Sequence, residues 1–555
     1  MLSSIPFEIP SYLLDRANTK RLSRMAIAGA DHKIALESAH KCALANLIEP
    51  VLIGDKRKIE LLAESVAWDI SKFQLINAIR EDDIAQVAVS LARAGEVATL
   101  MKGHLHTDIL MRAILNDKYG LRTNSRLSHI FHMTVPNNPR VLLITDGALN
   151  VAPNVSTKIE IVKNQQEFQL LKDGKPYYIK GAGAKSHFEL LANSGANSIR
   201  VWSTNNESYL DSAQKYNLTV SLGLYVRPER SGMDYNDKYA VKGQIEQLKK
   251  EILKFKDHPA LLIWGIGNEV DLRYSNFKVW ETIEELAKFI KKVDPNHPTM
   301  TVIAGLDPSK VFMIKKHCPS VDILGLNVYG SIEQASINIR KFNWDKPYIV
   351  SEWGVNGPFE AKKTTWNAKI EPPNGFKASQ RQRRYKQLIE KDTELCLGSY
   401  CFLWGQKQES TATWHGMFLS NGNPTEAIDV MHYCWKKEWP ESRAPSIKNI
   451  LLNNSNWKEN HEVNPNENAE LILEYKKYNN LEVEVNFYLY PESFSKKIGG
   501  DKQKTPDEIP LEVINQNKFG LTFLTPKKKG AYRIFAIVKN QKGQSSVANI
   551  PFLVK

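Results

Sequence analysis

The stretch Leu261-Leu-Ile-Trp-Gly-Ile-Gly-Asn-Glu-Val-Asp271 decides the fold of the central part of the chain. Its Leu, Ile and Trp residues, bounded by glycines, are typical of a strand that is buried on both faces. The apolar run ends at Glu269, and α/β barrels hold their catalytic groups at the C-terminal ends of such strands. A second stretch of the same form, Lys346-Pro-Tyr-Ile-Val-Ser-Glu-Trp-Gly354, ends in Glu352. We therefore predict that the two glutamates face each other across one barrel opening.

Similar apolar runs recur on both sides of these stretches, and helical patterns separate most of them. Eight strand–helix repeats predict a (β/α)8 TIM barrel, in which Glu269 closes the fourth strand and Glu352 the seventh. The connections 226–238 and 354–377 are long, and long loops on a barrel usually shape a site. The predicted strands are 177–181, 198–202, 219–225, 261–267, 298–304, 322–329, 347–351 and 398–404.

The regions on either side of the barrel have different patterns. Residues 1–154 alternate strands and helices, which predicts a parallel sheet with helical cover. A hairpin is predicted at 159–171, ahead of the barrel at 157–440. Residues 447–555 show short alternating strands, which favour an immunoglobulin-like β-sandwich. In the first region strands are predicted at 25–29, 50–54, 97–103, 127–135 and 140–145, and helices at 32–46, 55–68 and 82–94.

Composition narrows the class of protein. The chain has 555 residues, 42% of them hydrophobic and 24% charged, as in soluble globular proteins. No apolar run is long enough for a membrane span. The first residues lack the pattern of a secretory signal, so a cytoplasmic location is expected, with periplasmic or secreted locations left open. The five cysteines have no metal-type spacing and are expected to be reduced thiols.

The net charge of +13 invites a nucleic-acid hypothesis, but the lysines are spread along the chain. The densest runs, Lys496-Lys497 and Lys527-Lys-Lys529, lie beside turn residues and are better explained as solvated loops. The histidine pairs His104/His106 and His129/His132 have no acidic or thiol ligands at a recognisable spacing. We therefore expect no nucleic acid, metal or cofactor.

Two opposed carboxylates are what cleavage of a glycosidic bond requires. One protonates the departing oxygen, and the other attacks the sugar carbon or orients water behind it. The alternative is structural, because Asn268-Glu269 is also typical of a helix start and Glu352 of an ion pair at a strand end. The placement of both at the ends of barrel strands favours the catalytic interpretation.

The barrel region resembles the retaining glycoside hydrolases with two glutamates, above all the catalytic domain of family 2 and related β-glucanases. The resemblance is carried by Lys175-Pro-Tyr-Tyr-Ile-Lys-Gly-Ala-Gly183, Ser198-Ile-Arg-Val-Trp202, His258-Pro-Ala-Leu-Leu-Ile-Trp-Gly-Ile-Gly-Asn-Glu269 and Ile349-Val-Ser-Glu-Trp-Gly354. It implies that an oligo- or polysaccharide is the substrate, that Glu269 is the acid/base and that Glu352 is the nucleophile. Domain order departs from that of typical family 2 enzymes, so endo-glucanase, transglycosylase and exo-glycosidase activities all stay open.

The same resemblance implies roles for four neighbouring residues. Asn268 would hold the sugar 2-hydroxyl, and the charge of Arg200 would keep Glu352 ionised. Tyr329, in Leu326-Asn-Val-Tyr329, would hydrogen-bond the nucleophile. Trp404, at the end of the eighth strand, offers a flat face for a sugar ring. For Trp202, Tyr225, Trp353 and Trp414, packing in the core is at least as well supported.

Residues 1–153 resemble phosphate acetyl/butyryl transferases. The resemblance is carried by Pro50-Val-Leu-Ile-Gly-Asp55, Leu100-Met-Lys-Gly-His-Leu-His-Thr-Asp108, Arg126-Leu-Ser-His-Ile-Phe-His-Met133 and Leu142-Leu-Ile-Thr-Asp-Gly-Ala-Leu-Asn-Val-Ala-Pro153. It stops near Ser156, so only the first half of that fold is expected. The half-domain is expected to be poorly packed, to pair with a partner chain, or to be part of a fusion of unrelated reading frames. Acyl transfer and a carbohydrate-binding scaffold are the competing functions.

Overall fold

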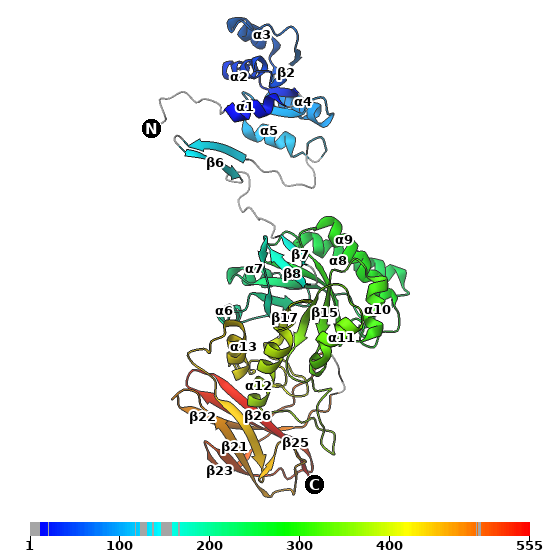
Figure 1. Cartoon of the computed structure of the whole chain (residues 1–555), viewed down its shortest axis with the longest axis vertical. Coiled ribbons are helices and arrows are strands. Elements are labelled where there is room, and N and C mark those ends of the chain that lie inside the picture. The colour runs from blue at the N-terminus through cyan, green and yellow to red at the C-terminus, as the bar shows by residue number, and fades with distance from the viewer. Residues whose placement is uncertain are drawn as a thin grey trace. The chain divides into compact units, whose positions relative to one another are not determined.

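The computed structural model describes residues 11–19, 22–116, 118–121, 130–135, 138–145, 158–164, 167–495, 497 and 501–555. His129, Ser156, Lys496 and the start of the predicted strand 127–135 lie outside these ranges. The chain divides into two compact units, Met1–Pro153 and Asn154–Lys555, which we describe separately (Figure 1).

The first unit contains a parallel sheet with strand order β3-β2-β1-β4. Its central strands alternate their side chains between two apolar clusters. Ala26 and Ala28 of β1 pack on the side of α4 and α5, and Ile27 packs on the side of α2 and α3. The elements are α1 Ser11–Asn18, β1 Ser23–Ala28, α2 Lys33–Leu44, β2 Ile48–Gly54, α3 Lys56–Ser65, β3 Gln74–Asn77, α4 Glu81–Arg93, β4 Thr99–Lys102 and α5 Thr107–Ile114.

This sheet agrees with the predicted strand–helix alternation of the first region. The sequence did not predict β3 and α5, because a strand of four residues and a helix of eight are too short to show a period. The strands β5 (Ile130–Val135) and β6 (Asn138–Thr145) form an antiparallel hairpin.

The second unit is built around a closed barrel of eight parallel strands, so the predicted barrel is confirmed. Each strand is followed by a helix on the outside. The strands are β10 Ile179–Ala184, β11 Ser198–Val201, β12 Thr219–Leu224, β13 Leu261–Asn268, β14 Thr299–Ala304, β15 Ile323–Asn327, β16 Tyr348–Trp353 and β17 Cys396–Trp404. The helices are α6 Phe188–Asn193, α7 Ser208–Lys215, α8 Lys238–Phe255, α9 Lys278–Val293, α10 Pro308–His317, α11 Ala335–Lys341, α12 Asn374–Arg384 and α13 Glu426–Lys436.

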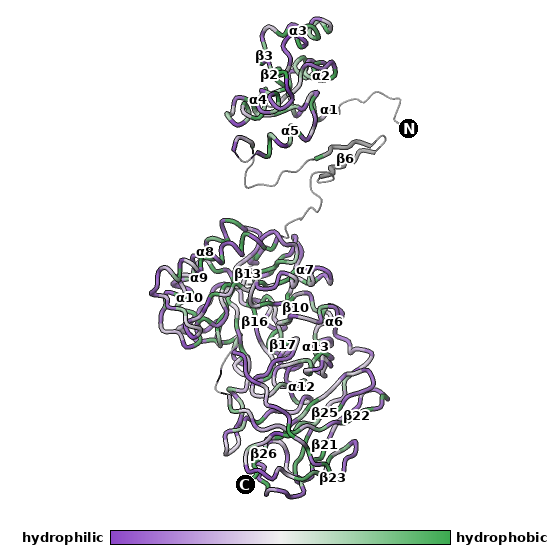
Figure 2. The backbone as a smooth tube through the Cα atoms, turned by 180° about the vertical axis from the view of Figure 1, so that it is seen from behind, coloured by the Kyte–Doolittle hydropathy of each residue, from purple (hydrophilic) through white to green (hydrophobic). Residues whose placement is uncertain are grey.

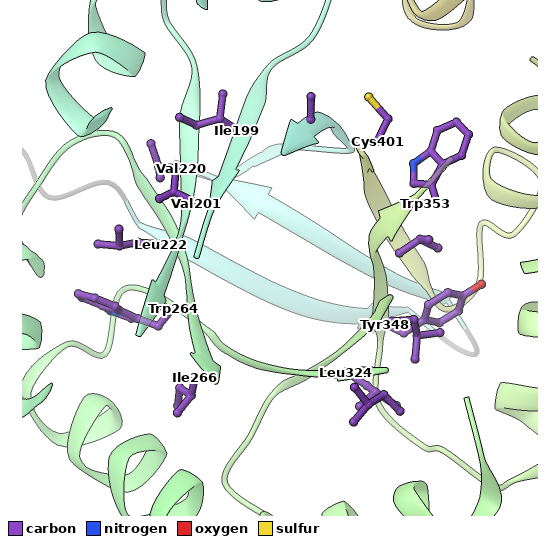
Figure 3. Close-up of a cluster of buried hydrophobic side chains, with 14 of the residues drawn as sticks. Ile199, Val201, Val220, Leu222, Trp264, Ile266, Leu324, Tyr348, Trp353 and Cys401 are labelled. Carbon is purple, nitrogen blue, oxygen red and sulfur yellow. The ribbon is translucent and has the colours of Figure 1, made fainter. Parts of the chain in front are cut away.

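Apolar side chains fill the space between the strands and the helices (Figure 3). In β11, Ile199 and Val201 point outward into this layer, so Arg200 between them points into the barrel. In β13, Trp264 and Ile266 occupy the same outer layer. Alternation along each strand therefore selects which residues reach the barrel interior.

The hairpin of β7 (Ile159–Asn164) and β8 (Glu167–Lys172), with the short β9 (Lys175–Pro176), lies before the first barrel strand. Ile159 and Leu170 join a cluster with barrel residues such as Leu262 and Ile349. These barrel residues lie near the strand starts, so the hairpin covers the N-terminal end and leaves the C-terminal end for the site.

Residues 446–554 form a β-sandwich of two sheets with a shared core that includes Ile534 and Phe523. Figure 2 shows hydrophobic stretches along the strands of the barrel and the sandwich, and hydrophilic loops between them. The sheet orders are β19-β18-β21-β24-β23 and β20-β26-β25-β22. The strands are β18 Ser446–Leu452, β19 Ser455–Asn456, β20 Glu462–Val463, β21 Asn468–Lys476, β22 Val483–Pro491, β23 Glu512–Asn517, β24 Gly520–Leu524, β25 Gly530–Asn540 and β26 Ser545–Val554.

Among the described residues, no helix is both long and apolar enough to cross a membrane.

Candidate active site

The predicted catalytic residues come together at the C-terminal ends of the barrel strands. Glu269 directly follows β13, and Glu352 lies near the end of β16. A register irregularity in β16 pairs Glu352 with Asn327 of β15, so that both Ser351 and Glu352 face the interior. Closure of the barrel brings these strand ends around one opening.

Glu352 is buried and is held by three donors. Its Oε1 accepts hydrogen bonds from Arg200 Nη1 and from Trp202 Nε1, both at 2.7 Å, and its Oε2 accepts from the Tyr329 hydroxyl at 2.9 Å. Burial, followed by the Glu352 charge, raises the pKa of Tyr329 well above its ordinary value, so the hydroxyl keeps the proton it donates. The carboxylate is thus fixed in position, and the guanidinium balances its charge.

Arg200 is itself buried and connects the nucleophile candidate to Asn268. Its Nη2 donates to Asn268 Oδ1 at 2.6 Å, while Nη1 also donates to the Ser351 carbonyl at 3.0 Å. Because the Asn268 oxygen is occupied in this way, its amide NH2 group is the part left to face a substrate.

Glu269 lies in a different environment. Its Oε1 accepts one hydrogen bond from Asn327 Nδ2 at 2.9 Å, and Ser351 Oγ orients Asn327 by donating to its Oδ1 at 2.9 Å. Burial, and secondly the charge of Glu352, raise the pKa of Glu269 to about 7. A carboxyl group with this pKa holds a proton in a large fraction of molecules near neutral pH.

The backbone of Glu269 adopts an unusual conformation, with a φ of 49°. The left-handed region costs an ordinary residue about 1–2 kcal/mol, and such outliers cluster at functional sites. Three hydrogen bonds hold the backbone there: Glu269 N donates to Val302 O at 3.0 Å, and Glu269 O accepts from Leu272 N at 3.2 Å and from Arg230 Nη1. Arg230 Nε is buried without a partner among the described residues.

Glu269 and Glu352 line a cavity of about 910 Å³, together with Trp202, Asn268, Asn327 and Tyr329. Two further rings in its lining are open to solvent, since Tyr225 is 53% and Phe359 is 67% exposed. Trp404 also belongs to the lining, but its ring is fully buried and packs against Phe418 and Trp435. It offers no exposed face, so the structure does not support the predicted stacking role.

Two residues contribute more to the site than the sequence predicts. Trp202 donates directly to Glu352, whereas the sequence favoured packing in the core for this residue at least as strongly. Asn327, which joins Glu269 to Asn268, was not singled out. Its position at the end of the sixth strand is the feature of the sequence from which its place in the site could be predicted. Trp353 and Trp414 are buried in the core.

Three described histidines of the first unit form other contacts. His106 Nδ1 pairs with Glu81 at 2.9 Å, and the hydrogen bond from this pair raises the pKa of His106. His32 and His104 stack, with ring centroids 4.3 Å apart. Within the described residues, no group of three His, Cys, Asp or Glu side chains is placed to hold a metal ion.

Comparison with known proteins matches two regions of the chain, and the first of them extends past residue 153, where the first compact unit ends. Residues 185–358 match the TIM barrel domain of glycosyl hydrolases family 2, and residues 78–176 match phosphate acetyl/butaryl transferase. Phosphate acetyltransferase of Rickettsia prowazekii is 40% identical over 29% of this chain and 47% of its own length. Phosphate butyryltransferase of Clostridium acetobutylicum is 29% identical over 27% of this chain and 50% of its own length.

Among solved structures, a β-glucuronidase of Bacteroides uniformis aligns with 17% identity and a TM-score of 0.40, covering 72% of this chain and 48% of that one. A β-galacturonidase of Eisenbergiella tayi aligns with 17% identity and a TM-score of 0.38, covering 51% of this chain and 54% of that one. The chain spans about half the length of the curated relatives it matches. It therefore carries a region similar to phosphate acetyl/butyryl transferases, followed by a barrel similar to that of the family 2 glycosyl hydrolases.

Proposed function

We propose that the barrel is a retaining glycoside hydrolase that cleaves β-linked glycans through a covalent glycosyl-enzyme intermediate. One observation carries the proposal: Glu269 and Glu352 line one cavity at barrel strand ends, the first with a pKa raised to about 7 and the second held by Arg200, Trp202 and Tyr329. A proton donor and a charged nucleophile are the two groups that this reaction needs.

In the first step, a carboxylate oxygen of Glu352 attacks the anomeric carbon, and the bond from that carbon to the leaving oxygen breaks. The Glu269 proton passes to the leaving oxygen. In the second step, Glu269 takes a proton from water, whose oxygen displaces Glu352 from the sugar. Asn268, with its oxygen bound by Arg200 and Asn327, directs its NH2 group to the sugar 2-hydroxyl.

A β-glucan is the proposed substrate class. If a sugar hydroxyl replaces water in the second step, the same site is a glucanosyltransferase. If neither step occurs, the barrel is a carbohydrate-binding scaffold. A panel of β-linked glucans and aryl β-glycosides separates these functions: release of reducing sugar that is lost in Glu352→Ala supports hydrolysis, and longer products indicate transfer. Binding of glucan without cleavage would favour the scaffold.

A second candidate is acyl transfer between acyl phosphate and coenzyme A by the first unit. It is favoured by the 40% identity of this region to a phosphate acetyltransferase. Since the match covers 47% of that relative, we propose that this activity, if present, needs a partner chain for the remaining half. An assay with acetyl phosphate and coenzyme A tests it, and activity of the purified chain alone would contradict the need for a partner.

A further inference from the structure

The cavity is not lined by the barrel alone. Asp501 and Gln503, from the connection between β22 and β23 of the sandwich, are part of its lining together with Lys497. Gln503 is buried, and its Oε1 accepts a hydrogen bond from the backbone N–H of Ser410 at 2.9 Å. Ser410 belongs to the loop that follows the last barrel strand, so this contact joins the sandwich to the rim of the barrel.

A buried network around Glu371 holds the same parts together. The Glu371 carboxylate, in the loop between β16 and α12, accepts from Lys377 Nζ at 2.6 Å and from Thr413 Oγ1 at 2.9 Å. It also accepts from Asn549 Nδ2 of β26 at 2.7 Å. Two loops of the barrel and one strand of the sandwich thus share one charged group, whose burial makes the arrangement rigid.

A second buried ion pair anchors the start of the β22–β23 connection. Arg533 of β25 pairs with Glu492 at 2.9 Å and donates to the Lys369 carbonyl at 2.6 Å. Lys369 lines the cavity, and its side chain is half-buried. Glu492 and the backbone of Lys369 are therefore held in place before any substrate arrives, which reduces the entropy lost when a substrate binds beside Lys369.

The contacts of the sandwich wall of the cavity place it on the Glu352 side. Glu409, next to Ser410, lies 3.8 Å from His415 Nε2, and the His415 ring is 5.0 Å from the ring of Tyr329, which donates to Glu352. Arg230, which also lines the cavity, binds the backbone of Glu269 instead. In the proposed reaction the sugar that is attacked lies against the nucleophile, so the wall faces that sugar, the glycone.

We propose that Asp501 and Gln503 form, with Lys369 and Glu409, a binding site for the hydroxyl groups of a neutral glycone. This inference rests on the proposed glycosidase function. A hydroxyl both donates and accepts, so a wall that alternates ammonium and carboxylate groups suits it. The exposed Asp501 carboxylate has no hydrogen bond or ion pair to any described residue, whereas Glu409 is paired with Lys407 at 2.7 Å. The Asp501 charge would therefore repel a carboxylated sugar.

The test compares Asp501→Ala with Asp507→Ala in the full chain. Asp507 lies in the same connection, is 92% exposed and is absent from the cavity lining. The substrates are 4-nitrophenyl β-glycosides of glucose, galactose, mannose and glucuronic acid. We expect a neutral glycoside to be the best substrate, Asp501→Ala to lower its kcat/KM about three- to tenfold, and Asp507→Ala to leave it unchanged. Melting temperatures of both variants should equal that of the wild type.

Equal kcat/KM values for the two variants, or a preference for the glucuronide, would overturn the inference. If the wild type hydrolyses none of these substrates, the proposed function fails. A binding measurement then tests the proposed glycone site independently. Cellotetraose and laminaritetraose are titrated against the same variants by calorimetry. Weaker binding by Asp501→Ala alone supports the wall, whereas equal or absent binding contradicts it.

Discussion

Glu269 and Glu352 line the same cavity in contrasting hydrogen-bonding environments. Within the part of the chain that the structure describes, Glu352 accepts from Arg200, Trp202 and Tyr329, whereas Glu269 accepts one side-chain hydrogen bond, from Asn327. The proximity of the Glu352 charge adds to burial in raising the pKa of Glu269. A carboxyl group with a raised pKa beside a carboxylate held by three donors is suited to the separate roles of acid and nucleophile.

Glu269→Ala should lower the rate of cleavage by an amount that depends on the leaving group of the substrate. An aryl β-glycoside with a basic leaving group needs the proton of Glu269, so its kcat/KM should fall about 10²–10⁴-fold. The leaving group of a 2,4-dinitrophenyl glycoside departs without being protonated. For this substrate the rate of the first step should therefore fall far less. Steady-state kinetics across a series of aryl glycosides measures the difference, and an equal loss for all of them would argue against the acid role.

Glu352 should carry the covalent intermediate. Incubation with a 2-deoxy-2-fluoro-β-glucosyl fluoride should add one glycosyl unit to the intact mass and place it on the peptide that contains Glu352. Glu360→Gln is a matched control, since Glu360 also lines the cavity but its carboxylate is bound by the backbone of Gly330 and Gly357. Labelling should persist in Glu360→Gln and vanish in Glu352→Ala. A label on any other residue would exclude Glu352 as the nucleophile.

The reaction should slow as the pH rises through about 7. Glu269 must be protonated for the first step, and with a pKa of about 7 its protonated fraction falls above that pH. Asn327→Ala removes a hydrogen bond that lowers this pKa, so the alkaline limb of kcat/KM should move to higher pH. A pH profile from about 5 to 9 measures both effects, and a limb that stays in place in Asn327→Ala would show that another group controls it.

Trp202→Phe should weaken catalysis while keeping an aromatic ring. The variant loses the Nε1 hydrogen bond to Glu352, and one hydrogen bond to a charged group is worth about 1.5–3 kcal/mol, so kcat should fall roughly 10- to 100-fold. Trp439→Phe serves as the control, because Trp439 lies outside the cavity lining. If the two variants have the same kcat, the contact has no catalytic role.

Glu426 should make the contact between barrel and sandwich sensitive to pH. It is buried, accepts from Ser446 and Ser546, and burial raises its pKa from 4.5 to about 7. Between these pH values the folded state holds a proton that the unfolded state releases. The contribution of Glu426 to the free energy of unfolding therefore falls by about 3 kcal/mol as the pH rises through that window.

Glu426→Gln cannot ionise, so its melting temperature relative to the wild type should increase from about pH 5 to about pH 8. Calorimetric melting at both pH values measures this, with the exposed Glu512→Gln as a control. A constant difference between the variant and the wild type would show that Glu426 does not titrate in this range.

The barrel could be predicted because its strands are local patterns. Each apolar run, such as Leu261 to Gly267, records burial on both faces within a few consecutive residues. The position of a glutamate at a strand end then implied that it faces the opening. The individual catalytic roles of Glu269, Glu352, Asn268, Arg200 and Tyr329 remain predictions that the experiments above test.

The sequence by itself determined the eight-stranded barrel, the sandwich after it and the strand ends on which the glutamates lie. Only the tertiary structure decided that Trp202 donates to Glu352, that Trp404 is buried, and that Asp501 and Gln503 line the cavity. The physical reason is range. Strand and helix patterns depend on neighbours along the chain. The contacts of Trp202 with Glu352 and of Gln503 with Ser410 instead join residues 150 and 93 positions apart, which meet only when the barrel closes and the sandwich packs against it.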